Sequence, residues 1–232
     1  MSVDMGESLV FSYLKHVKEC QIVQTNWKID TKEVAIVNGD SNIKEKYITI
    51  LETINNTIKE GIFNSDNLEQ ILKQGECDVI GIKTDNKTTE IYAADIAFHR
   101  ARLGYKDNFS KVIQKSTRTA ICVYQSFKVK KAIIIFATPK ISDEDKINIE
   151  KGLKDVEIII NENLNVNFSF ELLSGELFKN SVLDEVHNLW NKINDVNEYF
   201  LRCYQLEKIF EPKTSKTDNK TFETMIINDE IE

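Results

Sequence analysis

The sequence predicts an α/β fold in which helices flank a β-sheet. Three observations lead to this prediction. Stretches with apolar residues at helical spacing alternate along the chain with short strand-like runs. Two of these runs, 77–83 and 91–98, are separated by turn-forming residues 84–89 and predict a β-hairpin. The continuous apolar run 132–137 predicts a central strand that is covered on both faces.

Length and composition describe an ordinary globular chain. With 232 residues, 41% hydrophobic and 29% charged, we expect one domain over 1–210 and a polar, disordered tail over 211–232. No apolar stretch approaches the roughly 20 residues of a membrane span, and the N-terminus lacks a signal-like core. We therefore expect a cytoplasmic protein without a membrane partner. The four cysteines and three histidines are dispersed, which gives a structural zinc site almost no support.

Before the hairpin we expect a helix over 6–19, a strand over 21–27, a short strand or loop over 33–38, a helix over 45–63 and a short helix that stops at Gly75. Glu7 falls in the first turn of the first helix, where the helix dipole stabilises acids. Asp66 and Glu69 have the spacing of a capping box for the short helix. We interpret 31–75 as an insertion or lid on the core rather than a separate domain.

After the hairpin we expect a helix over 108–127, the strand 132–137, a helix over 142–163, a strand over 166–173 and helices over 176–193 and 195–210. Ser142 and Asp145 are spaced as a capping pair. Residues 141–210 thus form an α/β extension to the part of the chain that precedes them.

Each arm of the hairpin carries one aspartate inside an apolar run. A carboxylate in such a run costs several kcal/mol unless it finds a partner. Residues two apart share a strand face, so pairing of the arms would bring Asp78 and Asp95 together. Because two carboxylates repel unless a proton or cation lies between them, a divalent metal such as Mg²⁺ is the simplest partner. The alternative is that either aspartate merely ends a strand or caps a turn.

A basic segment follows the hairpin. Residues 100–131 contain nine lysines and arginines against the single acid Asp107, although the whole chain has a net charge of −7. This segment favours an anionic ligand over the alternative of a solvated helix face, and the net charge argues against indiscriminate nucleic-acid binding. The basic residues that we expect to contact nucleic acid are Lys28, Arg100, Arg102, Lys106, Lys111, Lys115 and Arg118.

The order of elements, namely helix, strand, two acidic strands, basic helix and apolar strand, resembles the PD-(D/E)XK superfamily of restriction-endonuclease-like nucleases. The resemblance covers about 6–138 and implies a three-layer core with a central mixed sheet, to which the extra C-terminal helices are added. Asp78 matches the family's first acid, and Asp95-Ile96-Ala97 falls where the acid-x-lysine triplet should be. Glu7 matches a glutamate that some members carry on the first helix.

The chain departs from the family pattern at the triplet. Its acid is the shorter aspartate, and the lysine position is Ala97. In the family, that lysine is thought to orient or activate the attacking water and to stabilise charge on the phosphate. Three explanations stay open: the cation has moved to Lys111, Lys115 or Lys28, the enzyme works with metal alone, or the site is inactive.

The resemblance implies a metal-dependent endonuclease that acts on DNA, as in restriction or defence. Mg²⁺ or Mn²⁺ would be held by Asp78, Asp95, the Ile96 carbonyl and Glu7, while Lys115 would serve as the catalytic cation and His99 as a base or phosphate donor. An enzyme of this kind that cuts both strands often works as a homodimer. The alternatives are a catalytically degenerate DNA-binding or protein-interaction module, and an α/β protein whose acids are purely structural.

Overall fold

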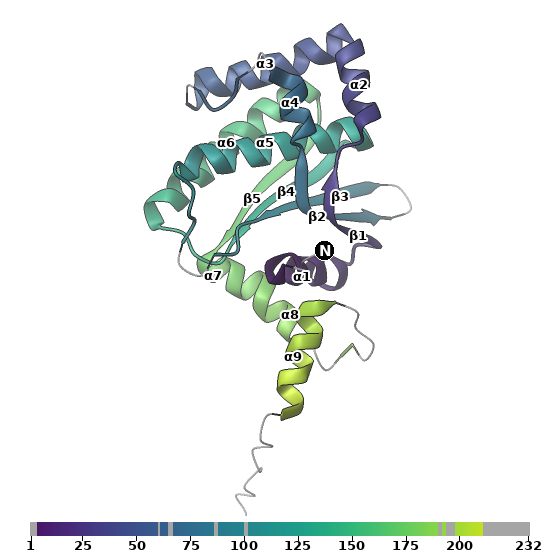
Figure 1. The fold of residues 1–232 in the computed structure, drawn as a ribbon, viewed down its shortest axis with the longest axis vertical. Helices are drawn as coiled ribbons and strands as arrows, with labels where there is room; N and C mark the ends of the chain where they lie inside the picture. The colour runs from purple at the N-terminus through teal and green to yellow at the C-terminus, as the bar shows by residue number, and fades with distance from the viewer. Residues whose placement is uncertain are drawn as a thin grey trace, which may run out of the picture.

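A computed structural model describes residues 4–59, 61–64, 67–85, 88–99, 102–189, 192–193 and 198–210. A five-stranded sheet in the order β1-β2-β3-β4-β5 lies between two layers of helices (Figure 1). Its strands are β1 (Ile22–Lys28), β2 (Glu76–Thr84), β3 (Thr89–Ile96), β4 (Lys131–Thr138) and β5 (Asn167–Ser174). The predicted α/β class, with a mixed sheet flanked by helices, is confirmed. Within the described ranges, no helix is long and apolar enough to cross a membrane.

The sheet is antiparallel on one side and parallel on the other. β2 pairs antiparallel with both β1 and β3, whereas β4 runs parallel to β3 and to β5. The predicted hairpin is therefore confirmed as β2 and β3. Strand β4 is covered on both faces, as its continuous apolar run predicted, because Ile134 and Ile135 belong to the cores on opposite sides of the sheet.

One face of the sheet is covered by α2 (Thr31–Gly39), α3 (Ser41–Thr57), α4 (Leu68–Lys73), α5 (Asn108–Phe127) and α6 (Asp143–Leu164). Helix α5 matches its predicted range. Asp107 begins it by accepting a hydrogen bond from the Ser110 N–H at 3.0 Å, and Lys128 ends it in the left-handed conformation at φ 50°. Ser142 caps α6 as predicted, accepting from the Asp145 N–H at 3.2 Å.

The expectation of a strand or loop at 33–38 is wrong, since these residues lie in α2. The Asp30 side chain accepts from the Lys32 N–H at 2.7 Å and so starts the helix, and Val34 and Val37 are buried one turn apart. Asp40 likewise starts α3 earlier than predicted by capping it. Asp66, the expected start of a capping box, lies outside the described residues, while Glu69 forms an ion pair with Lys73 at 2.6 Å.

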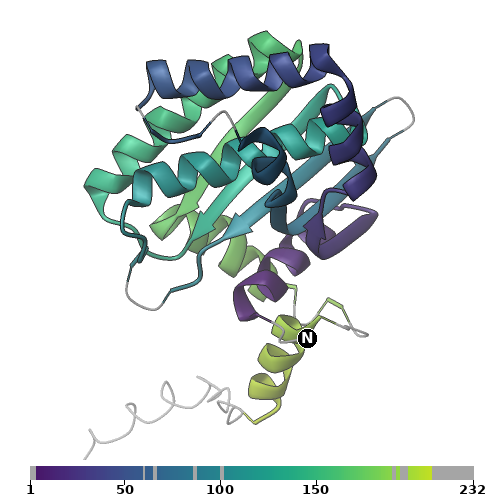
Figure 2. The ribbon, with the colours of Figure 1, turned by 45° about the horizontal axis from the view of Figure 1, so that its top comes forward.

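The opposite face of the sheet is covered by α1 (Met5–Ser12), which continues as the π-helical segment η1 (Tyr13–Val17), and by the C-terminal helices. The predicted helix over 176–193 consists of α7 (Gly175–Phe178), the π-helical η3 (Lys179–Asp184) and α8 (Glu185–His187). Helix α9 (Tyr199–Phe210) lies beside α1, so the first and last helices of the described chain are neighbours (Figure 2). The predicted disordered tail lies outside the described residues.

Candidate active site

The hairpin brings its two aspartates together. Val79 and Ala94 form the last pair of the antiparallel register, and Asp78 and Asp95 are the next residues on the two strands. The side chain of Asp95 is only 3% exposed, and Asp78 is partly buried. An Asp78 oxygen, Oδ2, accepts a hydrogen bond from the Ile96 N–H at 2.6 Å. The two carboxylates thus occupy neighbouring strands at the end of the hairpin distant from its turn.

Helix α5 supplies a cation to this pair. Lys115 Nζ lies 3.2 Å from Asp95 Oδ1, and one turn later the Thr119 hydroxyl donates to Asp95 Oδ2 at 2.9 Å. Lys115 is the one of the three candidate cations that forms an ion pair with an acid of the hairpin pair, since Lys28 pairs with Glu76 at 2.6 Å. Lys111 makes no ion pair within the described ranges.

The charges at the site are unbalanced. Burial and the neighbouring charge of Asp95 raise the pKa of Asp78 from 3.8 to about 6, despite the Ile96 hydrogen bond and the charge of Lys115. Burial alone would lower the pKa of Lys115, but the charges of Asp95 and Asp78 outweigh it and raise that pKa. Lys115 contacts Asp95 and acts on Asp78 through its charge alone, so the two carboxylates outweigh the one lysine that is paired with them.

Glu7 lies near this pair on α1. The helix approaches the end of β3 closely at Gly6, where a Cβ atom would lie 2.8 Å from Phe98 Cβ. Glu7 Oε2 accepts from Asn26 Nδ2 at 3.3 Å, and burial and Asp4 raise the pKa of Glu7. Its charge contributes to the raised pKa of Asp78. In the described part of the chain, however, no three His, Cys, Asp or Glu side chains are grouped closely enough to hold a metal ion.

The position of the family lysine is closed to solvent. Ala97 is 2% exposed; its N–H donates to the Ala137 carbonyl at 2.9 Å, and its own carbonyl accepts from Thr138 Oγ1 at 3.0 Å. Ile96 is the last residue of β3, and its carbonyl as a metal ligand stays a prediction.

His99 does not share the strand face of Asp95, because β3 ends at Ile96, two residues earlier than predicted. His99 is exposed and its ring meets Tyr105 edge-on, with centroids 6.4 Å apart. Tyr105 is nearer the acids: burial raises its pKa, and Asp95 and Asp78 add to this effect against the charge of Lys115. His99 is thus linked to the site through Tyr105.

The basic segment divides into two groups. Lys111, Lys115 and Arg118 lie on the part of α5 beside the acids, where Arg118 donates to Gln74 Oε1 at 3.2 Å. Burial and the charges of Arg118 and Lys115 lower the pKa of Lys111. Arg102 and Lys106 are exposed in the loop before α5, and Arg100 lies outside the described residues.

Lys128, Lys130 and Lys131 form the second basic group. It lies at the C-terminal end of α5, where Lys128 is about 15 Å from Arg118 along the helix axis. Its side chains bond to local partners: Lys128 to Gln125, Lys130 to the Asn165 carbonyl and Lys131 to Glu90. The basic residues of 100–131 therefore do not form one surface beside the acids, and Lys128, Lys130 and Lys131 lie outside the set that we expect to contact nucleic acid.

Sequence reasoning missed Thr119 and Asn26 and gave Tyr105 no role beside the acids. Thr119 had a usable signal, because it lies four residues after Lys115 and so shares its helix face.

Comparison of the chain with family models, curated proteins and solved structures finds no match.

Proposed function

We propose that the protein is a metal-dependent phosphodiesterase with a restriction-endonuclease-like core and that it cuts DNA. The observation that carries this proposal is that Asp78 and Asp95 lie on neighbouring strands at one end of the hairpin while Lys115 reaches Asp95 from α5. The order of the elements and the strand directions of the sheet support it, because β1, β2 and β3 are antiparallel and β4 is parallel to β3. Since enzymes that cut both DNA strands often work as two-fold dimers, a homodimer forms part of the proposal.

The donor set fits a hard divalent cation. Mg²⁺ is usually held by one or two carboxylates together with water and substrate phosphates. Asp78 and Asp95 would hold it together with the Ile96 carbonyl, whereas Glu7, which is not grouped closely with the two aspartates, would be an outer or second-metal ligand. The raised pKa of Asp78 reflects negative charge that a cation would balance. The bound ion would lower the pKa of a water molecule and act as a Lewis acid toward the phosphate.

The protein's own residues would prepare and complete this site. Lys115 would take the place of the family lysine, because its ammonium lies beside Asp95 while Ala97 is buried. From there it would offset charge that builds on the phosphate. Thr119 holds the carboxylate of Asp95 in place. Lys111 and Arg118 extend the positive charge along α5 toward flanking phosphates.

The proposal is tested by DNA cleavage with Mg²⁺ or Mn²⁺ for the wild type and for Asp95→Asn and Lys115→Met. We expect each substitution to reduce cleavage by about 100-fold or more. Lys131→Met, which changes an exposed lysine of the same basic segment, should keep wild-type activity. Mg²⁺ should also raise the melting temperature of the wild type at pH 8 but not that of Asp78→Asn. Absence of cleavage by the wild type, or full activity in Asp95→Asn, would overturn the assignment.

A degenerate DNA-binding module is the second candidate. The ion pair between Lys115 and Asp95 favours it, because this pair satisfies the buried carboxylate without a metal. This candidate predicts DNA binding that weakens with salt, does not respond to Mg²⁺ and never leads to cleavage.

A further inference from the structure

A pocket of about 140 Å³ lies between α4, residues 62–64 and α5. Most of the described residues that line it carry side-chain amides, and the only charged one is Arg118. The amides belong to Asn64, Asn67, Gln70, Gln74 and Gln114. This pocket is much smaller than the roughly 300–1,000 Å³ of sites for drug-sized ligands, so it suits a single small ring system.

The lining has the chemistry of a nucleobase site. A carboxamide offers both a donor and an acceptor, as the edges of nucleobases do, and Asn and Gln are the side chains that pair with adenine edges in DNA complexes. Ile62, Phe63 and Ile71 supply apolar surface on which the face of a ring could pack. Among the described residues that line the pocket, Arg118 is charged and none is acidic.

Hydrogen bonds already hold several of the amides in place. Gln114 Nε2 donates to the Ile62 carbonyl, and Asn67 Nδ2 donates to Gln70 Oε1. Within the described ranges, Gln114 Oε1 makes no hydrogen bond, so this acceptor is available to a ligand. Arg118 uses Nη1 to contact Gln74, and a guanidinium has further N–H donors for a phosphate. The pocket therefore offers oriented groups rather than free side chains.

The pocket adjoins the candidate active site. Lys111, Gln114, Lys115 and Arg118 are spaced by three, one and three residues, so they lie on one face of α5. Lys115 contacts Asp95, while Gln114 and Arg118 line the pocket. A phosphate held by Lys111 or Arg118 would therefore lie between the two acids and the amide-lined pocket.

We infer that this pocket receives one unpaired nucleobase of the nucleic acid whose phosphate lies at the active site. The inference rests on the proposed function and narrows its substrate to a strand with an accessible base, either single-stranded or turned out of a duplex. Turning a base out of the stack costs a few kcal/mol, and an amide pocket that bonds to the base edge would offset part of this.

The test measures binding, not cleavage. Fluorescence anisotropy of the full chain in EDTA would compare a labelled single-stranded DNA with an abasic strand of the same length and charge. We expect the wild type to bind the base-containing strand about tenfold more tightly. The double substitution Gln74→Met and Gln114→Met should abolish this preference without weakening abasic binding. Arg118→Met should weaken the binding of both strands equally. Gln24→Met, which changes an exposed glutamine on β1, should leave the binding of both strands unchanged.

The outcomes separate this inference from the proposed function. If the wild type cuts DNA but the double variant keeps the tenfold preference, the pocket inference is wrong and the nuclease proposal stands. If the wild type neither cuts nor binds DNA, calorimetry with adenosine monophosphate and with inorganic phosphate decides whether the pocket binds a nucleobase. Binding of the nucleotide alone, lost in the double variant, would keep a nucleobase pocket without a nuclease. Binding of neither, or of both equally, would overturn the pocket.

Discussion

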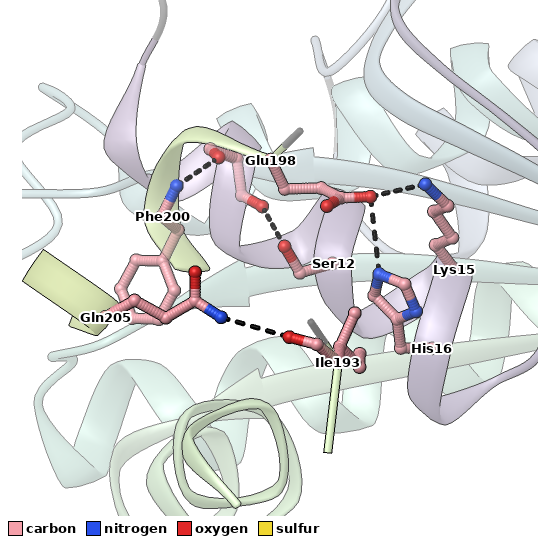
Figure 3. A network of polar contacts seen from close by, with 8 residues as sticks. Ser12, Lys15, His16, Ile193, Glu198, Phe200 and Gln205 are labelled. Carbon is pink, nitrogen blue, oxygen red and sulfur yellow. Dashed lines mark hydrogen bonds and ion pairs between the residues drawn. The ribbon is translucent and has the colours of Figure 1, made fainter. Parts of the chain in front are cut away.

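Two regions of the molecule bury carboxylates beside lysines, and they differ in charge balance. In the hairpin, Asp78 and Asp95 share Lys115, and the pKa of Asp78 is raised. On the other side of the sheet, Glu198 accepts from Lys15 at 2.5 Å and lies 3.3 Å from His16 Nε2 (Figure 3).

The difference between these regions shows in the pKa of their acids. Burial alone would raise the pKa of Glu198, whose side chain is 3% exposed, but the hydrogen bond and charge of Lys15 lower it overall. One carboxylate with two basic neighbours has its charge balanced within the protein, although its second oxygen, Oε2, is buried without a hydrogen-bond partner among the described residues. Two carboxylates with one lysine keep negative charge for a ligand, so the hairpin is the better candidate for function.

The Glu198 network has a structural task, which is to attach α9 to α1. Glu198 directly precedes α9, and Lys15 and His16 belong to η1. The Phe200 N–H donates to Ser8 Oγ at 2.8 Å (Figure 3). All of these bonds join the first helical segment to the last, so their loss should release α9 without disturbing the hairpin.

The largest effect should come from removing the lysine shared by the two aspartates. Lys115→Met should lower the free energy of unfolding at pH 8 by about 3 kcal/mol, because it leaves Asp95 buried without its counter-charge. Urea unfolding would measure this. Lys111→Met, one turn earlier on the same helix face, is the control and should change stability by no more than about 0.5 kcal/mol. Equal effects of the two substitutions on the free energy of unfolding would mean that Lys115 does not stabilise the buried charge of Asp95.

An effect of opposite sign should follow from Asp78→Asn. The pKa of Asp78 rises from 3.8 to about 6, so folding takes up a proton between these pH values and stability falls as the pH rises through them. Removing the ionised form should raise the free energy of unfolding by up to about 3 kcal/mol at pH 8 and leave it nearly unchanged near pH 3, below both pKa values. Unfolding curves at both pH values, with Glu150→Gln as an exposed control, would show this. Destabilisation at pH 8 would contradict it.

The smallest effect should come from Glu198→Gln. We expect a loss of about 1–2 kcal/mol at pH 7, since the ion pair with Lys15 is replaced by a hydrogen bond from the ammonium to an uncharged amide. The pKa of Glu198 is lowered from 4.5, so this contribution is present above that pH and disappears as the pH falls through the lowered folded value. Hydrogen exchange in α9, with Glu207→Gln as control, would locate the change. If the substitution increased hydrogen exchange more in β3 than in α9, the proposed role of Glu198 in attaching α9 would be refuted.

The sequence predicted the parts of the site that depend on neighbouring residues. Asp78 and Asp95 could be paired in advance because a short turn and alternating faces determine how hairpin arms meet. Lys115 was preferred over Lys111 and Lys28 without a local signal to justify it, because the choice depends on how α5 packs across the sheet. The network around Glu198 gave no sequence signal at all, since its partners lie 183 and 182 residues away.

The β2–β3 hairpin also has a consequence for the order of folding. The bonds that assemble the acidic site span 18, 20 and 24 residues, and all of their partners lie between Asp78 and Thr119. Closing such short loops carries a small entropic cost, whereas the contact between Lys15 and Glu198 must close almost the whole described chain. During synthesis, the residues of the acidic site are all available long before Glu198 is made. We therefore expect the hairpin and α5 to associate early and α9 to dock last.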